Sequence, residues 1–470
     1  MRPLFKYLAK VTIQLTTPLH IGNSNSDDLT DSPVLLDQNE LPTIPGSSIA
    51  GVLRSEFKRA YNNPSLENKL FGHQKENNDD PDKGSLLSIS WAAIHNSRNI
   101  PMEGIIGPEA FNDCIINLAK GCNQKIRDHV RITDRGVSDS KDTDGKTGHG
   151  KFDEAIVSAG NRFTFELELS SYDEQEATNM WDMLLSVLHS PSLRFGGRSR
   201  RGLGAFNIVC CYEGRFDLSK NLDGYIASLG SLNNFNNLNR YNAAANNNLS
   251  GYQTISLDLI ADSYWMFGGG DDNNVNKAQS APLKEEVIEW NTNNIGNIHK
   301  YNLVIPASSI KGALSHRIAY HYNLLQQKWA DTGDAKAGEE NEAVKALFGY
   351  CKNNNQSDGA RGKVIINDIF IPDEEFNQKL INHVSIDRFT GGAMPGKLFN
   401  ERPVCADSRI PLTILVEKEV INEPDPQNPN LIRKALKHTL IDLAEGRLQL
   451  GAGSGRGNGY FRAEIPGNFL

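Results

Sequence analysis

The stretch LPTIPGSSIAGVLRSEFKRAY, from Leu41 to Tyr61, returns in nearly the same form as LVIPASSIKGALSHRIAYHY, from Leu303 to Tyr322. In both copies a Pro closes an extended segment and a Ser pair follows. Apolar residues then recur at i, i+3, i+4 and i+8, the spacing of a helix that buries one face. We expect each Ser pair to cap its helix by accepting hydrogen bonds from first-turn N–H groups. The pairs are Ser47 with Ser48 and Ser308 with Ser309. This repetition predicts an internal duplication of the chain.

The composition is that of a globular protein of two or three domains, since 470 residues exceed a single core and 39% of them are hydrophobic. A net charge of -8 and a pI near 5.8 argue against a protein that coats nucleic acid through bulk positive charge, so any basic site has to be local. The six Cys form no CxxC pair and no zinc-type array, which indicates reduced thiols. The sequence has no signal-peptide core and no membrane-spanning run, so we expect a cytoplasmic protein without a membrane partner.

The same elements recur in the same order in both halves. An alternating strand comes before each copy of the repeated stretch, and LFG follows each copy, at Leu70 and at Leu347. HVRITDR at 129–135 then matches HVSIDR at 383–388, and an alternating strand, a second amphipathic helix and a glycine-rich loop close each half. Each half therefore reads β-α-β-β-α-β, and we expect an α+β protein of two tandem ferredoxin-like domains.

The duplication sets the expected domain boundaries. The first domain is expected at residues 1–215 and the second at residues 251–470. Residues 216–250 between them are Asn-rich, with NNFNNLNRYNAAANNN at their centre, and are too polar to form a core of their own. We expect this segment to be a surface linker.

The two glycine-rich loops are the first candidate site. They read LRFGGRSRRGLGAF at 193–206 and LQLGAGSGRGNGYF at 448–461. Glycines let a backbone come close to a ligand, and guanidinium groups bind phosphate oxygens. A tight turn packed against a sheet is the structural alternative. The basic residues of the loops are Arg198, Arg200, Arg201 and Arg456. Because the loop occurs twice, phosphate binding is the favoured interpretation.

The helix starts and an acidic loop are two further candidates. A helix N-terminus has free N–H donors and partial positive charge, which suits a phosphate, and the second copy adds Lys311. A purely structural helix start remains the alternative. The acidic loop after the first strand carries Asp27, Asp28 and Asp31. These carboxylates are either solvated surface charge, or one of them lies beside a scissile phosphate as a metal ligand or proton acceptor.

Taken together, LHIG, DSPV, IPGSSIAGVLRSEF, LFG, HVRITDR and the glycine-rich loop resemble the RAMP superfamily of CRISPR-associated proteins. The chain is most similar to backbone subunits of type III interference complexes, and both halves carry the resemblance, so it looks like two fused subunits. The resemblance implies RRM-like RAMP domains with a protruding thumb hairpin in each half. It also implies binding of a crRNA guide, of target RNA and of other subunits of a type III complex. A loop Asp would support Mg²⁺-dependent cleavage of the target RNA.

The family's loop Asp precedes a small residue and a Pro, which places it on Asp31 as catalytic residue and metal ligand. In the second half, FGGGDDNNVNKAQSAPLKEE puts Ser280 before the corresponding Ala-Pro, where no carboxylate is present. Asp271 and Asp272 at the start of that loop are the alternative second-half candidates. The resemblance also places the thumbs at 136–155 and 389–404.

The guide RNA is expected to contact hydroxyl and basic side chains of the helix starts, the glycine-rich loops and the HVRITDR-like segments. These side chains are Ser47, Ser48, Arg54, His129, Arg131, Arg198, Arg200, Arg201, Ser308, Ser309, Lys311, His383, Arg388 and Arg456. Two alternatives stay open. One is a crRNA-binding scaffold without catalysis. The other is a RAMP endonuclease that processes guide precursor without metal, for which His20 and His129 are the acid–base candidates. Metal dependence of cleavage separates these functions.

Overall fold

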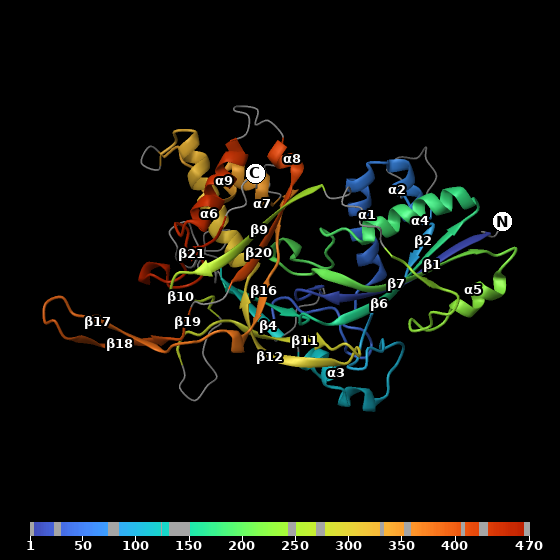
Figure 1. Ribbon diagram of the computed structural model, residues 1–470, viewed down its shortest axis with the longest axis horizontal. Helices are drawn as coiled ribbons and strands as arrows, with labels where there is room; N and C mark the ends of the chain where they lie inside the picture. Colours follow the sequence, from blue (N-terminus) through green and yellow to red (C-terminus); the bar gives the residue numbers. More distant parts are fainter. Residues whose placement is uncertain are drawn as a thin grey trace.

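Two α+β halves, each with its own sheet, make up the protein (Figure 1). The computed structural model describes residues 4–22, 30–73, 84–123, 125–130, 151–242, 251–268, 278–329, 333–351, 359–405, 409–422 and 431–464. Within these residues no helix is long and apolar enough to cross a membrane.

The main sheet of the first half is antiparallel, with α1 and α4 on one face and α5 on the other. Its elements are β1 (Phe5–Leu15), α1 (Gly46–Tyr61), α2 (Pro64–Phe71), β2 (Leu87–Ile89), β3 (Ala93–Ile94), η1 (Pro108–Asn112), α3 (Cys114–Ala119), η2 (Gly121–Asn123), β4 (Lys125–Val130), β5 (Lys151–Ile156), β6 (Arg162–Ser171), α4 (Glu174–Leu188), η3 (Ser199–Arg201), β7 (Phe206–Asp217), α5 (Leu222–Ser228) and β8 (Asn239–Arg240). The strand order is β2-β6-β1-β7-β8, with β3 also on β6. The four main strands, β2, β6, β1 and β7, have the ferredoxin-like order.

The second half repeats this arrangement. Its elements are β9 (Tyr252–Ala261), β10 (Tyr264–Trp265), β11 (Lys284–Trp290), β12 (Gly296–Ile305), α6 (Ala307–Leu325), η5 (Gly338–Glu340), α7 (Glu342–Phe348), β13 (Gly349–Tyr350), β14 (Ala360–Arg361), β15 (Val364–Ile366), β16 (Ile369–Pro372), η6 (Asp373–Glu375), β17 (Ile381–Ile386), β18 (Ala393–Glu401), β19 (Val404–Cys405), β20 (Ile410–Glu417), α8 (Lys418–Asn422), α9 (Leu431–Ala444), η7 (Ser454–Arg456) and β21 (Phe461–Arg462). The order β15-β20-β9-β21 matches that of the first half strand for strand. The prediction of two tandem ferredoxin-like domains is therefore confirmed.

The repeated helices supply the cores, as their apolar spacing predicts. In the first half Ile49, Leu53 and Phe57 of α1 are fully buried and belong to one apolar cluster with the sheet and α4. In the second half Ile310, Leu314 and Ile318 of α6 occupy the same places in a separate cluster with α9. The apolar stripe thus packs each helix onto its own sheet.

The predicted Ser caps are wrong. Pro45 and Pro306 occupy the N-cap positions, and neither helix has a side-chain cap hydrogen bond. The Ser pairs fall inside the first helical turn, where the first Ser lies two positions after the N-cap and its hydroxyl cannot serve as the N-cap acceptor. At helix α6 the carboxylate of Asp368 satisfies a first-turn donor instead, since its Oδ1 accepts from the backbone N–H of Ala307 at 2.7 Å.

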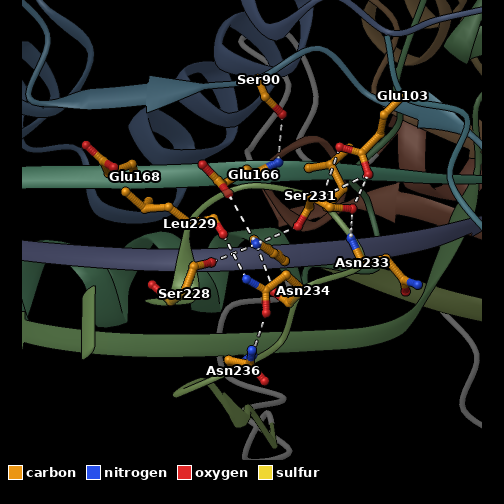
Figure 2. A network of polar contacts seen from close by, with 12 residues as sticks. Ser90, Glu103, Glu166, Glu168, Ser228, Leu229, Ser231, Asn233, Asn234 and Asn236 are labelled. Carbon is orange, nitrogen blue, oxygen red and sulfur yellow. Dashed lines mark hydrogen bonds and ion pairs between the residues drawn. The ribbon is translucent and has the colours of Figure 1, made fainter. Parts of the chain in front are cut away.

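The segment expected to be a surface linker packs against the first sheet over residues 218–242. Helix α5 lies within it, and β8 pairs with β7. Phe216 and Leu238 form a small apolar cluster with Leu8 of β1. The side chain of Lys10 on the same face is fully buried, and its Nζ donates to the carbonyls of Ser228 at 2.9 Å and of Ser231 and Asn234 at 2.8 Å (Figure 2). The polar segment is ordered because its carbonyls solvate a buried ammonium group.

A hairpin that is much longer than the corresponding bridge between Leu36 and Pro42 in the first half connects the second half to the first. Strands β11 and β12 form this hairpin, which also pairs with β16. The indole Nε1 of Trp290 donates to the carbonyl of Gly160 at 2.8 Å, and the guanidinium of Arg162 lies 4.0 Å from the centre of the indole ring system. The backbone N–H of Ile288 donates to Ala159 at 3.0 Å. The halves keep separate sheets but share a specific interface.

Three charged side chains are buried at that interface. Arg127 of β4 donates to both carboxylate oxygens of Glu285, at 2.9 and 2.8 Å, and to Asp368. Each of the three side chains is at most 3% exposed. Burial alone would lower the pKa of Arg127, but Asp368 and then Glu285 raise it above its ordinary value. The arginine comes from the first half and both carboxylates from the second, so this ion-pair network fixes how the halves meet.

Candidate nucleic-acid interface

A buried glutamate lies at the centre of the same polar cluster in both halves. Glu154 of β5 accepts from Nε2 of His129 at 2.7 Å and from Nε of Arg198 at 3.1 Å. In the second half Glu401 of β18 accepts from Nε2 of His383 at 3.0 Å and from Arg456. We call each set a His–Glu–Arg cluster. In the first half the cluster connects β4 and β5 to the glycine-rich loop, and in the second half it connects β17 and β18 to the corresponding loop.

An aromatic ring completes each cluster. The imidazole of His129 stacks on Phe152 with ring centres 5.0 Å apart and an interplanar angle of 16°, and the Arg198 guanidinium lies 5.9 Å from the Phe152 ring centre. The corresponding distances to Phe399 are 4.8 Å for His383, at 17°, and 5.5 Å for Arg456. Each arginine is thus held by a carboxylate and a ring together, which limits its rotamers.

The buried glutamates are held in their charged form. Burial alone would raise the pKa of Glu154, but the hydrogen bond and charge of His129, with the charges of His20 and Arg198, lower it below its ordinary value. Arg456 and His383 lower the pKa of Glu401 against the same effect of burial. The side chains of Arg198 and Arg456 nevertheless remain 39% and 42% exposed. The clusters therefore present fixed guanidinium groups to solvent.

The first glycine-rich loop packs against the start of the second repeated helix. Gly202 has φ +102°, and a Cβ there would lie 2.5 Å from the Cβ of Ala307 and from Oδ1 of Asp368. Only glycine permits this conformation and this approach without strain. Two sites that the sequence analysis predicted separately, the loop of one half and the helix start of the other, thus form one surface.

That surface carries a cluster of cations. Burial and then the charges of Arg201 and Arg200 lower the pKa of Lys311, and burial and then Arg198 lower the pKa of Arg201. The Arg201 guanidinium lies 5.0 Å from the Phe152 ring centre, and its buried Nη1 has no hydrogen-bond partner within the described part of the chain. An anion bound here would relieve the mutual repulsion and accept from this nitrogen. Arg198, Arg201 and Lys311 thus form a local group of cations on a chain that is acidic overall.

Arg200 and Arg54 have mainly structural surroundings. Burial lowers the pKa of Arg200, and Tyr252 of the second sheet opposes that effect, through its charge and then through a hydrogen bond. Arg54 donates to Glu67 at 2.7 Å and to Asn68 at 3.1 Å, both on the neighbouring helix α2. Arg54 therefore does not join the cation cluster as the sequence analysis expected, whereas Arg200 borders it, since its charge lowers the pKa of Lys311.

The predicted catalytic Asp31 is paired with a second aspartate. The backbone N–H of Asp31 donates to Oδ1 of Asp153 at 2.8 Å, and the backbone N–H of Asp153 donates to Oδ2 of Asp31 at 3.2 Å. In the second half the backbone N–H of Gln279 donates to Oδ1 of Asn400 at 2.7 Å, and that of Asn400 donates to Oε1 of Gln279 at 3.3 Å. The loop geometry is thus repeated, with amides in place of both carboxylates.

The residue equivalent to Asp31 is therefore Gln279, and the alignment on Ser280 is wrong by one position. The carbonyl of Ser32 accepts from Ala155 at 3.0 Å, and the carbonyl of Ser280 accepts from Arg402 at 2.9 Å, so Ser280 matches Ser32. The error came from aligning on the Pro, which occurs one residue later in the second copy. The conclusion that this position lacks a carboxylate is unchanged.

A third position also differs between the halves. His20 is buried, with Nδ1 2.8 Å from the carbonyl of Ala155 and Nε2 3.1 Å from Oγ of Ser32. Its counterpart is Met266, whose sulfur lies 4.0 Å from Oγ of Ser280. The first half thus has two aspartates and a histidine where the second has two amides and a thioether.

The second-half thumb starts earlier than predicted. HVSI of HVSIDR belongs to β17, and the following Asp387 and Arg388 enter the turn to β18. Strands β17 and β18 pair in a long hairpin that projects from the molecule at the left of Figure 1. Phe389 at its turn is 99% exposed, and the neighbouring Arg388 is exposed as well. In the first half β4 pairs with β5 in the same way. Arg131 and most of the first predicted thumb lie outside the described residues, as do Asp27, Asp28, Asp271 and Asp272.

The helix-start hydroxyls are only partly available. Ser47 and Ser309 are exposed, whereas Ser48 and Ser308 are half-buried. Sequence reasoning also missed the residues at the centre of the clusters. These are Phe152, Asp153 and Glu154 in the first half and Phe399, Asn400 and Glu401 in the second. The repeated text FDE and FNE, each at the end of a thumb, was the available signal.

A divalent cation would have few ligands from the protein alone. The described residues contain no group of three or more His, Cys, Asp or Glu side chains placed to hold a metal ion. Asp31 and Asp153 supply two adjacent carboxylates. Mg²⁺ is often held by one or two carboxylates together with substrate phosphates and water. The donor set therefore fits an ion shared with a bound RNA.

Comparison with known families matches both halves. A family model described as the RAMP superfamily matches residues 12–207 and 262–462, which together make up most of the chain. No curated protein matches the sequence.

Proposed function

The chain belongs to the RAMP superfamily, and from this membership we propose that it is a crRNA-binding backbone subunit of a type III CRISPR interference complex that cleaves target RNA in its first half. Membership supports a CRISPR-associated RNA-binding role for the whole chain. The finer proposal depends on one observation above all, the cation cluster of Arg198, Arg201 and Lys311. That cluster is built from both halves and meets the requirement for a local basic site on an acidic protein.

RNA recognition would use the backbone of the guide. The guanidinium groups of Arg198 and Arg456 are held at corresponding places in the two halves by a glutamate and a phenylalanine. Fixed guanidinium groups suit phosphate oxygens, which carry no sequence information. The exposed aromatic at the tip of the second thumb, Phe389, offers a face on which a base stacks. Such contacts suit a protein that binds guides of any sequence.

Cleavage is assigned to the first half because only that half has carboxylates in the paired loop. In RNA cleavage the 2′-oxygen attacks the adjacent phosphate, and charge develops on the phosphoryl oxygens. Asp31 would accept the 2′-OH proton or, with Asp153, hold the metal ion. A bound Mg²⁺ would stabilise charge on the phosphoryl oxygens. In the second half Gln279 and Asn400 keep the loop conformation, but an amide neither accepts a proton at neutral pH nor binds Mg²⁺ strongly.

The observations favour a non-catalytic scaffold role for the second half alone. The metal-free processing alternative gains no support, because both nitrogens of His20 lie near protein partners and His129 is bonded to Glu154. Cleavage of a complementary target by the complex reconstituted with guide RNA, with and without EDTA, tests the proposed function.

Substituting the cation cluster is expected to weaken guide binding and its salt dependence. In the double variant Arg201→Gln with Lys311→Gln, the slope of log K against log salt should fall by about 0.7 for each phosphate of single-stranded RNA that the protein no longer neutralises. Neither side chain pairs with Glu154, so the variant leaves the His–Glu–Arg cluster in place. The measurement is a fluorescence-anisotropy titration of labelled guide at several salt concentrations.

Arg54→Gln is the matched control, because it removes one exposed cation that is engaged with α2. It should leave the slope unchanged. An unaltered slope in the double variant would show that RNA does not bind at this surface.

A further inference from the structure

A cavity of about 590 Å³ lies in the first half, outside the residues assigned above to RNA. Residues 36–38, 90–93 and 102–104 line it together with Glu166 of β6 and residues 230 and 232 of the Asn-rich segment. Among the described residues that line the cavity there are three carboxylates, Asp37, Glu103 and Glu166, and no Lys or Arg. The cavity therefore favours a cationic ligand.

Two of these carboxylates are already occupied by the protein. Oδ1 of Asp37 accepts from the backbone N–H groups of Asn39 at 2.7 Å and Leu41 at 2.9 Å. Glu103 accepts from Oγ of Ser231 at 2.6 Å (Figure 2). It also accepts from the backbone N–H of Leu232 at 2.9 Å. The carboxylates of Asp37 and Glu103 therefore line the cavity but are already hydrogen-bonded to protein groups.

Glu166 differs, although a lysine lies beneath it. Nζ of Lys10 is 3.7 Å from Oε2 of Glu166, beyond hydrogen-bond distance, and its three protons go to the three carbonyls of the Asn-rich segment (Figure 2). Lys10 and Glu166 therefore form an ion pair, while the three N–H groups of the ammonium are directed to the carbonyls. Burial raises the pKa of Glu166 despite the opposing charge of Lys10. Among the described residues, its carboxylate accepts no hydrogen bond within 3.5 Å, and Lys10 is its ion-pair partner.

An aromatic ring completes the site. Trp91 lines the cavity and is 56% exposed, and Met102 and Leu232 add apolar wall. Ile105, next to the lining residue Gly104, is 84% exposed. A cavity lined by both a carboxylate and a partly exposed indole suits a guanidinium group, which forms bidentate hydrogen bonds and stacks on aromatic rings.

We propose that this cavity receives an arginine side chain presented by another protein. The choice of a protein over a nucleotide follows from charge, since three carboxylates and no cation would repel a phosphate. The exposed apolar rim suits the residues on either side of such an arginine. The inference goes beyond the proposed function and does not depend on it, because the test below contains no RNA.

The test is a titration of the full-length chain with the peptide acetyl-Gly-Arg-Gly-amide, followed by saturation-transfer NMR. The matched probe is the same peptide with citrulline, which has nearly the same shape but no charge. We expect the arginine peptide to bind at least tenfold more tightly than the citrulline peptide. Glu166→Gln and Trp91→Ala should each weaken its binding at least tenfold.

Glu168→Gln is the matched control variant, because Glu168 lies on the same strand and is engaged by Lys6 and by the hydroxyl of Tyr225. It should leave peptide binding unchanged. Equal affinity for the two peptides, or undiminished binding by Glu166→Gln, would overturn the proposal. Tighter binding of spermidine that does not depend on Trp91 would make this a polyamine site, and displacement of the peptide by AMP would make it a nucleotide site. Either result would also overturn it.

Discussion

Asp31→Asn is expected to abolish one cut in the target RNA while leaving guide and target bound. A positioned acid–base group typically contributes about 10²- to 10⁴-fold to the rate, so single-turnover cleavage at that position should fall by this factor. Asparagine keeps an oxygen that accepts from the backbone N–H of Asp153, as Gln279 does from Asn400 in the second half. The variant therefore removes charge and basicity but retains the loop conformation.

Gln279→Ala is the matched control, since it alters the corresponding loop of the half that lacks the carboxylates. It should change neither the number of cuts nor their rates. The measurement is single-turnover cleavage of end-labelled target by the reconstituted complex, with the affinity for target measured in parallel. Wild-type cleavage at every position by Asp31→Asn would show that the catalytic assignment is wrong.

Asp153→Asn separates the two roles that Asp31 has in the proposal. If the two aspartates hold Mg²⁺ together, this variant should require a higher Mg²⁺ concentration for half-maximal cleavage, because one carboxylate ligand is removed. If Asp31 acts only as a proton acceptor, the Mg²⁺ requirement should stay unchanged. The Mg²⁺ dependence of the rate thus distinguishes two mechanisms that the geometry of Asp31 alone does not.

The fold could be predicted because its signals are local and occur twice. The stripe of Ile49, Leu53 and Phe57 predicts a buried helix face from spacing alone, and its repetition gives the order of elements in both halves. The helix caps could not be predicted in this way. Pro45 and Ser47 lie two residues apart, and only the backbone conformation determines which of them is the N-cap.

The site was harder to predict because its members lie far apart in the sequence. Glu154 is bonded to His129 and to Arg198, 25 and 44 residues away, and no local pattern marks such contacts. Likewise, nothing in an acidic chain indicates that Lys311 meets the loop of Arg201 across the interface between the halves. Gln279 was misassigned because Pro282 was used as the anchor, although the hydrogen bonds of the loop, which fix the register, do not involve that Pro.

Arg127→Met is expected to destabilise the junction between the halves by about 3 to 5 kcal/mol, the cost of removing one partner from a buried ion pair. The substitution leaves the carboxylates of Glu285 and Asp368 buried without their cation. Exchange of the amide of Ala307, which donates to Asp368, should become faster, and hydrogen–deuterium exchange followed by mass spectrometry measures it locally. The triple variant Arg127→Met, Glu285→Gln, Asp368→Asn should recover most of the stability, because it buries no unpaired charge and asparagine still accepts from Ala307.

The same substitution also tests whether the junction organises the RNA surface. Asp368 accepts from Arg127 and from the backbone N–H of Ala307, and it lies close to Gly202. Its position therefore links the buried ion-pair network to the contact between the first glycine-rich loop and helix α6. If Arg127→Met shifts Asp368, Lys311 should move away from Arg201, and the salt slope of guide binding should fall toward that of the cation-cluster double variant. Asp31 is held by Asp153, within the first half, so cleavage by complexes already saturated with guide should keep its rate. If Arg127→Met has the same amide exchange at Ala307 and the same salt slope of guide binding as the wild type, Arg127 does not determine how the halves pack together.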